Sequence, residues 1–133
     1  MILHCDFEEL QALNRGAEFV LVARQSRSPS LMLVSDDAIA RVDDLRPLLV
    51  GSITIADLQE VDSIQTAVQL IARTLQQMMQ TAVLEYHPAH EEAVGLYFDY
   101  AHVFGVEHRV NDMAAEMHAL ADLMGSGSAV GNG

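Results

Sequence analysis

The sequence of 133 residues has no lysine, no tryptophan and a single cysteine, Cys5. A lone cysteine excludes an internal disulfide framework. The longest uninterrupted apolar run, Phe19 to Ala23, is far too short to cross a bilayer. The first residues also lack a basic stretch followed by a long apolar core, so we expect no signal peptide. Together these features predict a cytoplasmic protein.

Positive charge is scarce as well. Lys and Arg together number 7, all of them Arg, against 19 acidic residues, which gives a formal net charge of −12. The imbalance is largest in residues 57–125, which carry eleven acidic residues and two arginines. Such a surface repels phosphate backbones and anionic membranes, so we expect neither nucleic acid nor a membrane as partner. A basic protein would suit it, although a solvated acidic surface is the simpler interpretation.

Half of the residues are apolar, which excludes a disordered chain, and the length suits one domain. We expect this single helical domain to cover residues 1–124. The remaining residues, 125–133, are almost entirely Gly, Ser and other small residues, which predicts a flexible tail.

The longest regular pattern lies between Asp57 and His87. Large apolar residues recur there at steps of three and four, which predicts an amphipathic helix of roughly 30 residues with a Gln-rich polar face. Asp57 and Glu60 lie three residues apart and resemble a capping box at its start. His87 precedes Pro88, and helical geometry is disfavoured before proline, so we expect the helix to end there.

A second long helix is predicted from Pro88, which suits a first helical turn, to Met124. An apolar stripe runs along its whole length and keeps its phase across Gly105. This continuity favours one helix, with Gly105 as a candidate kink, rather than a reversal of the chain. The two long helices should therefore form an antiparallel hairpin that bends at Pro88.

The first half of this second helix carries additional apolar residues on another face: Val94, Tyr97, Phe98, Ala101 and Phe104. A helix that is apolar on two faces needs cover on both. We therefore expect 94–106 to be the most deeply buried segment of the protein, with Phe98 and Ala101 almost fully buried.

Shorter elements are predicted before the hairpin. Asp6, with Glu9 three residues later, can cap a helix from Phe7 to about Val22. The β-favouring residues from Glu18 to Ala23 leave a strand as the alternative for its second half.

The segment between this helix and the hairpin contains a polar loop and then a second helix. Ser35 or Asp36 caps that helix, Pro47 weakens its last turn and Gly51 closes it. The next residues, 52–55, alternate in the manner of a short strand, and the apolar residues 31–34 are its natural partner. The fold class is therefore mainly α: a long antiparallel helical hairpin packed with shorter N-terminal helices and a short two-stranded β element.

Histidines and carboxylates alternate between His87 and His118, and this cluster is the candidate for metal chemistry. Asp99 and His102 lie three residues apart on one helical face, a spacing that resembles one of the Glu-x-x-His pairs of di-metal helical bundles. The chain has one such pair, with Asp in place of Glu, so an ion pair between Arg73 and Asp99 or Glu92 is the plainer interpretation. A second cluster, at the bend, has side chains that could hold a divalent ion, although a solvated helix start is the simpler interpretation: Glu85, His87, His90 and Glu91.

No pattern in the chain predicts nucleophilic or phosphate chemistry. Cys5 has His4 beside it, but adjacent residues of a strand or helix point apart. The glycines at 51, 95 and 105 are isolated and do not form a phosphate-binding loop. We therefore expect neither a catalytic residue nor a cofactor, with a divalent metal as the alternative.

Two functions fit these features. The first is a small acidic helical interaction module, an accessory, adaptor or chaperone-like subunit that dimerises or docks to a protein partner. Its methionine-rich stripe would form part of the core or an adaptable binding surface. The second is a metal- or ligand-binding helical protein that uses the cluster between His87 and His118. We favour the first as a two-fold homodimer, because the 56 residues before the hairpin can cover one of its sides but hardly two.

Overall fold

The computed structural model describes residues 1–26, 34–87 and 89–132, with side chains as far as residue 125. In chain order its elements are β1 (Ile2–Leu3), α1 (Phe7–Gln25), α2 (Asp36–Leu45), the 3-10 turn η2 (Arg46–Leu48), β2 (Ile53–Thr54), α3 (Leu58–Glu85) and α4 (Glu91–Asn132). The prediction of a mainly α chain with a long helical hairpin, shorter N-terminal helices and a two-stranded β element is confirmed.

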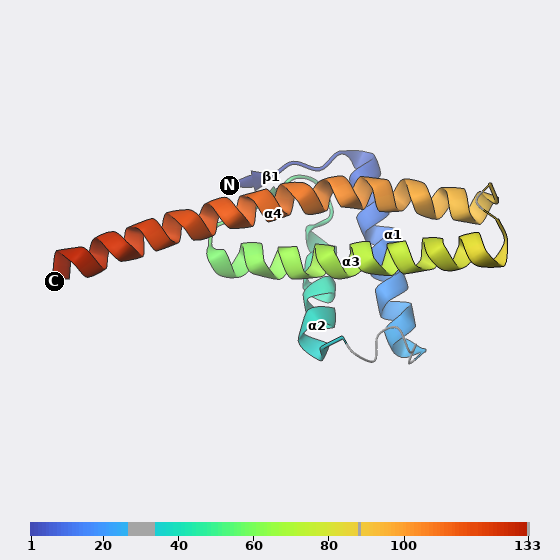
Figure 1. Ribbon diagram of the computed structural model, residues 1–133, viewed down its shortest axis with the longest axis horizontal. Coiled ribbons are helices and arrows are strands. Elements are labelled where there is room, and N and C mark those ends of the chain that lie inside the picture. The colour runs from blue at the N-terminus through green and yellow to red at the C-terminus, as the bar shows by residue number, and fades with distance from the viewer. Residues whose placement is uncertain (27–33, 88, 133) are drawn as a thin grey trace.

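The two long helices, α3 and α4, lie side by side and run in opposite directions (Figure 1). α3 begins where the sequence predicts, because the Asp57 carboxylate accepts a hydrogen bond of 2.9 Å from the Glu60 backbone N–H. α4 begins at Glu91, three residues later than expected, and Pro88 itself lies outside the described residues. The acidic first turn of α4, Glu91 and Glu92, is favoured by the helix dipole.

α4 passes through Gly105 as one helix and ends at Asn132 rather than at Met124. Side-chain contacts fix its register against α3. The Gln65 amide donates to Asn111 Oδ1 at 2.9 Å, and His118 Nε2 lies 2.7 Å from Asp62 Oδ1. The expected division between a domain of residues 1–124 and a flexible tail of 125–133 stays a prediction.

α1 is one helix from Phe7 to Gln25, so the alternative of a strand at 18–23 is wrong. Asp6 and Glu9 form the predicted capping box, in which each side chain accepts the other residue's backbone N–H, at 2.9 Å and 2.7 Å. Its buried side chains, Leu13, Ala17 and Val20, pack into the core with α3. This packing explains why the β-favouring residues of its second half stay helical.

α2 is capped by Ser35, whose hydroxyl accepts the Ala38 N–H at 3.1 Å, and it tightens into η2 around Pro47 as predicted. β2 pairs antiparallel with β1, in the register Ile2 opposite Thr54 and Leu3 opposite Ile53. The partner of β2 is therefore β1 rather than residues 31–34, of which 31–33 lie outside the described part of the chain. Leu3 and Ile53 are both buried, so this pairing closes one end of the core.

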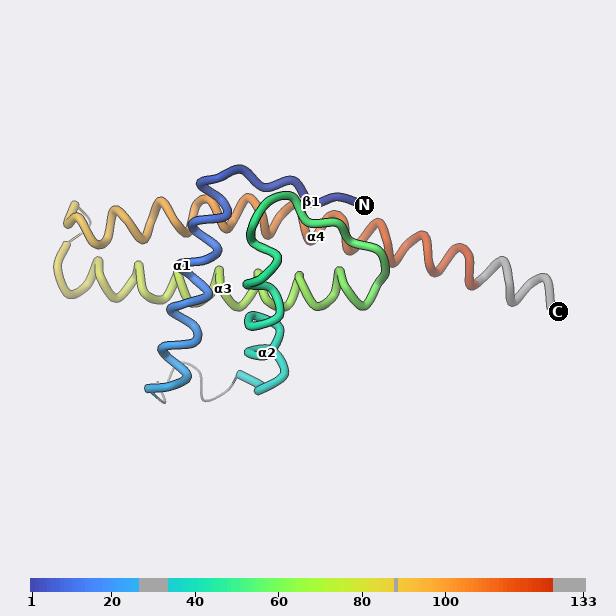
Figure 2. Tube along the Cα trace, turned by 180° about the vertical axis from the view of Figure 1, so that it is seen from behind, coloured from blue at the N-terminus to red at the C-terminus, as the bar shows by residue number. Residues whose placement is uncertain are grey.

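α1 crosses both helices of the α3–α4 hairpin, and α2 packs beside α1 against α3 on the same side, which gives the molecule two layers (Figures 1 and 2). This arrangement overturns the expectation for the segment 94–106. Phe98 is 57% exposed and Ala101 is exposed, although Val103 and Val106 in the same segment are fully buried. The physical reason is that both short helices cover one side of the hairpin, so only one of the two apolar faces of α4 lies in the core.

Candidate interaction surface

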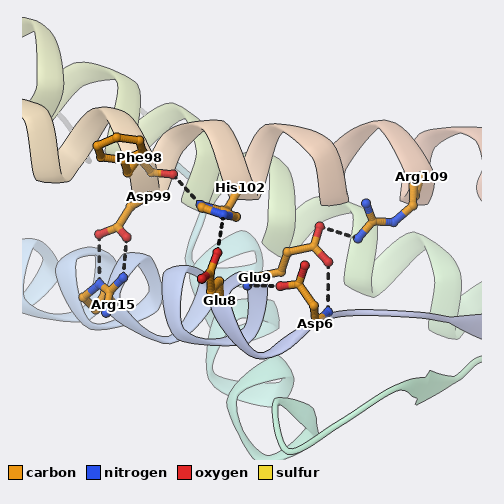
Figure 3. Close-up of polar contacts among 8 residues, drawn as sticks. All are labelled: Asp6, Glu8, Glu9, Arg15, Phe98, Asp99, His102 and Arg109. Atoms are coloured by element: carbon orange, nitrogen blue, oxygen red, sulfur yellow. Dashed lines mark hydrogen bonds and ion pairs between the residues drawn. The ribbon is translucent and has the colours of Figure 1, made fainter.

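Three polar pairs join α1 to α4 in a row that we call the α1–α4 polar row (Figure 3). Its members are Glu8 with His102, Glu9 with Arg109, and Arg15 with Asp99. On α1 the first and last of these residues are seven apart, which is two helical turns, so their side chains point to the same side. The row fixes how α1 crosses α4 and thereby which face of α4 is left outside.

Asp99 is the most buried acidic side chain of α4, at 8% exposure. Arg15 approaches it with two nitrogens: Nε donates to Oδ2 at 2.9 Å, and Nη2 donates to Oδ1. This fork geometry satisfies both carboxylate oxygens, and the same contact raises the pKa of the Arg15 guanidinium. The cation that pairs with Asp99 therefore comes from α1 and is not Arg73, the partner proposed from the sequence.

Glu9 has two roles at once. Its Oε1 closes the capping box of α1, and its Oε2 accepts from Arg109 Nη2 at 2.6 Å. Arg109 also donates to the His4 carbonyl oxygen at 3.1 Å, so one guanidinium ties α4 to the start of α1 and to the segment after β1. Since Glu9 is 9% exposed, the pair balances a charge that would otherwise be buried alone.

His102 lies between two acceptors. Its Nδ1 is 2.7 Å from the Phe98 carbonyl oxygen, and its Nε2 is 3.1 Å from Glu8 Oε2. The hydrogen bond to Phe98 is the main cause that raises the pKa of His102, and Glu8 adds to it, against a smaller opposing effect of burial. This environment favours the imidazolium, in which both ring nitrogens donate.

The lone cysteine is half-buried beside the polar row. Burial, and then the charge of Glu9, raise the pKa of the Cys5 thiol. The thiolate is the nucleophilic form of cysteine, so this environment favours the unreactive thiol.

Four of the residues proposed as metal ligands make other contacts: Asp99, His102, His87 and His90. Asp99 and His102 both point toward α1, where each meets its own partner (Figure 3). At the bend, His87 Nδ1 and His90 Nδ1 accept the backbone N–H groups of Ala89 and Glu92, both at 3.2 Å. Within the described part of the chain, no three His, Cys, Asp or Glu side chains are grouped so that they could hold a metal ion. A metal at Asp99, His102, His87, His90 or Glu91 stays a prediction.

Sequence reasoning missed Arg15 and the second role of Glu9. The signal that was available is the pair of spacings: Glu8 and Arg15 are two turns apart on α1, while Asp99 and His102 share a face of α4. The spacing of these residues does not predict the angle at which α1 and α4 cross.

The second feature is an exposed apolar face on α4, directly opposite its buried residues. We call it the outer face of α4. Its apolar members near the bend are Val94, Tyr97, Phe98, Ala101 and Phe104. Phe98 and Tyr97 are each 57% exposed, Phe104 is 44% exposed and Val94 38%. Three aromatic rings so gathered in a chain with 5% aromatic residues form a patch of the kind that marks an interaction site.

The outer face continues beyond the aromatic residues. At alternating steps of four and three it presents Val94, Phe98, Ala101, Gly105, His108, Asp112, Ala115 and Ala119. All of these are exposed except Gly105, which is half-buried. Farther on, α4 projects past the start of α3 (Figure 1), and Leu120, Leu123 and Met124 are 51%, 71% and 73% exposed there. The outer face therefore has an aromatic end and a polar middle, and of these three exposed residues only Leu123 continues the same face.

Comparisons with known proteins found no match for this chain. No protein-family model, curated protein or solved structure matches the chain. Among the described residues, no helix combines the length and the apolar character that crossing a membrane requires.

Proposed function

We propose that this protein is a small acidic helical interaction module, an accessory, adaptor or chaperone-like subunit that dimerises or docks to a protein partner through the outer face of α4. The observation that carries the proposal is the exposure of Tyr97, Phe98 and Phe104 on a helix whose opposite side is fully buried. A helix with two apolar faces is stable in water when a second surface covers the outer one.

The charge distribution supports docking at this face. Between Val94 and His108 the outer face carries no carboxylate, although the chain as a whole has 19 acidic residues. An exposed stretch that has aromatic side chains and no carboxylate has the composition of an interface core, and here it is the aromatic end of the outer face. The methionines at 113 and 117 are partly buried against the core, so this module presents aromatic rather than methionine side chains to its partner.

The hairpin gives the docking face a rigid support. α4 is held by α3 along the contacts at Asn111 and His118 and by α1 along the polar row, so its outer face is preorganised. Binding to a preordered helix costs less conformational entropy than binding to a segment that folds on contact.

Sedimentation equilibrium at micromolar concentration, in low and in moderate salt, tests the proposal. We expect a mass above that of the 14.5 kDa chain, and tighter association in moderate salt because salt screens the repulsion between copies of charge −12. A mass of 14.5 kDa under both conditions would contradict self-docking.

A further inference from the structure

Resting on the proposed function, we infer that the occupant of the outer face is a second copy of this chain, bound as an antiparallel two-fold pair of α4 helices. In this pair His108 of each copy lies opposite Asp112 of the other. The inference depends on the order of side chains along the face and on their charges.

The spacing of the outer face is that of a helix–helix seam. Steps of four and three alternate from Val94 to Ala119, which is the repeat that keeps one face of a helix toward a partner helix. Small residues occupy most of the seam on both sides of its middle: Ala101, Gly105, Ala115 and Ala119. Small side chains let two helices approach closely, so larger residues at the flanks can close over the contact.

The charges select the antiparallel direction. In a parallel two-fold pair each residue of the seam meets its own copy, so Asp112 and, three residues after Ala119, Asp122 would each face a like charge. In the antiparallel pair centred between His108 and Asp112, the imidazole of one copy meets the carboxylate of the other, twice. A polar layer inside an otherwise apolar seam is the usual device by which helix pairs fix their register.

The same register covers the aromatic end of α4. With His108 opposite Asp112, Ala101 lies opposite Ala119. The level of Tyr97 and Phe98 in one copy is that of Leu123 and Asp122 in the other, and Leu123 lies on the same side of the seam as Phe98, so it packs on the aromatic end of the partner. Phe104 of one copy and Ala115 of the other also share one side of the seam, so the Phe104 ring packs over Ala115. Centring the pair on Ala101 instead would stack the aromatic ends and leave Leu123 in water.

The contact has the size of a weak, concentration-dependent dimer. Residues 94–124 span about 45 Å at 1.5 Å per residue. The three half-exposed rings offer roughly 300 Å² per copy, at about 200 Å² for a whole aromatic side chain. Leu123, 71% exposed, and Val94, 38% exposed, lie on the same face and add a smaller area. Both copies together stay below the roughly 1,200 Å² of standard interfaces, in the range of weak ones.

Disulfide trapping tests the direction and the register together. In a Cys5→Ala background, which removes the native thiol, the double variant Ala101→Cys/Ala119→Cys places two thiol pairs across the proposed seam. The two new cysteines of one chain are about 27 Å apart along α4, so they cannot bridge within it. We expect mild oxidation to convert the double variant into a covalent dimer on a non-reducing gel.

The single variants Ala101→Cys and Ala119→Cys, in the same background, are the matched controls and should stay monomeric on that gel. A covalent dimer of Ala101→Cys alone would overturn the register in favour of a parallel pair or one centred on Ala101, while self-docking would stand. No covalent dimer in any variant, together with a dimeric mass in solution, would move the interface to another surface. If all variants and the parent chain are monomeric by mass, the second copy itself is refuted, and the outer face must take a different protein.

Discussion

Gly16 of α1 lies against Ile71 of α3 at the point where the two helices cross. A Cβ atom placed on Gly16 would stand 2.3 Å from Ile71 Cγ2 and 3.2 Å from Leu75 Cδ1. Both neighbours are fully buried, so neither has room to move aside. The absence of a side chain at Gly16, inside α1, is therefore what permits the close approach of α1 to α3.

We predict that Gly16→Ala destabilises the protein by up to about 2 kcal/mol, because overpacking of the crossing costs about 1–3 kcal/mol and the gain in helix propensity offsets only about 1 kcal/mol of it. Gly95→Ala is the matched control: it also replaces a helical glycine, but nothing lies within 4 Å of the new Cβ. That variant should be stabilised by about 0.5–1 kcal/mol. Urea denaturation measures both changes, and a stabilised Gly16→Ala would mean that α1 does not cross so closely.

The contact between Arg15 and Asp99 predicts that two arginine variants, Arg15→Gln and Arg41→Gln, lose different amounts of stability. Arg15→Gln leaves the buried carboxylate with one weaker donor, and we expect a loss of about 1–2 kcal/mol, reduced from the value for a fully buried pair because Arg15 is half-exposed. Arg41→Gln removes a comparable arginine from the exposed pair with Asp37, 3.1 Å away, and should change stability by less than about 0.5 kcal/mol. Equal losses from both variants would show that the fork on Asp99 adds nothing.

His102 predicts a pH dependence with a definite sign. The pKa of the folded state lies above the ordinary value of 6.5, so the folded protein holds this proton more tightly than the unfolded chain. Its contribution to stability is fully present below pH 6.5 and is lost as pH rises through the raised pKa. Urea denaturation on both sides of this window should show the loss in the parent chain and not in His102→Gln.

Titration of the His102 ring protons by NMR provides the direct check on this pKa. Glu8→Gln should lower the value only partway toward 6.5, because the hydrogen bond to the Phe98 carbonyl is the larger cause and is retained. A His102 pKa at or below 6.5 in the parent chain would contradict the hydrogen-bond arrangement of the polar row.

The helix caps and the long apolar stripes show which features were predictable from the sequence. Asp6 with Glu9, Ser35, and Asp57 with Glu60 were found because a cap depends on residues three or four apart. The long apolar stripes likewise report a helical face without reference to the rest of the fold.

The burial of Phe98 and the partner of Asp99 were not predictable in this way. Both depend on which side of the hairpin α1 crosses, and that is decided by contacts between residues some eighty positions apart, such as Arg15 with Asp99. The second apolar face of α4 was recognised in the sequence. The error was to expect Phe98 and Ala101 to be buried in the single chain, in which α1 and α2 lie on the other side of the hairpin.

The polar middle of the outer face predicts that its two polar side chains, His108 and Asp112, can be exchanged. His108→Asp would put carboxylates opposite one another in the proposed pair and should weaken dimerisation at least tenfold, or about 1.4 kcal/mol. The exchanged variant His108→Asp/Asp112→His restores the opposition of unlike groups and should recover most of the affinity. Sedimentation velocity over a concentration series measures both. Equal weakening in the single and the exchanged variants would mean that these two positions do not meet.

The central claim is that the outer face of α4 is an interface, and the most direct test is the mass in solution of three proteins measured by light scattering after gel filtration. The parent chain should be dimeric, and Phe98→Asp should be a monomer with unchanged helical content, because Phe98 is 57% exposed in the single chain. Val50→Asp is the control: it puts the same acid in place of a more exposed apolar residue, 89% exposed, outside α4, and should stay dimeric. A Phe98→Asp protein with the same mass as the parent chain would contradict the account.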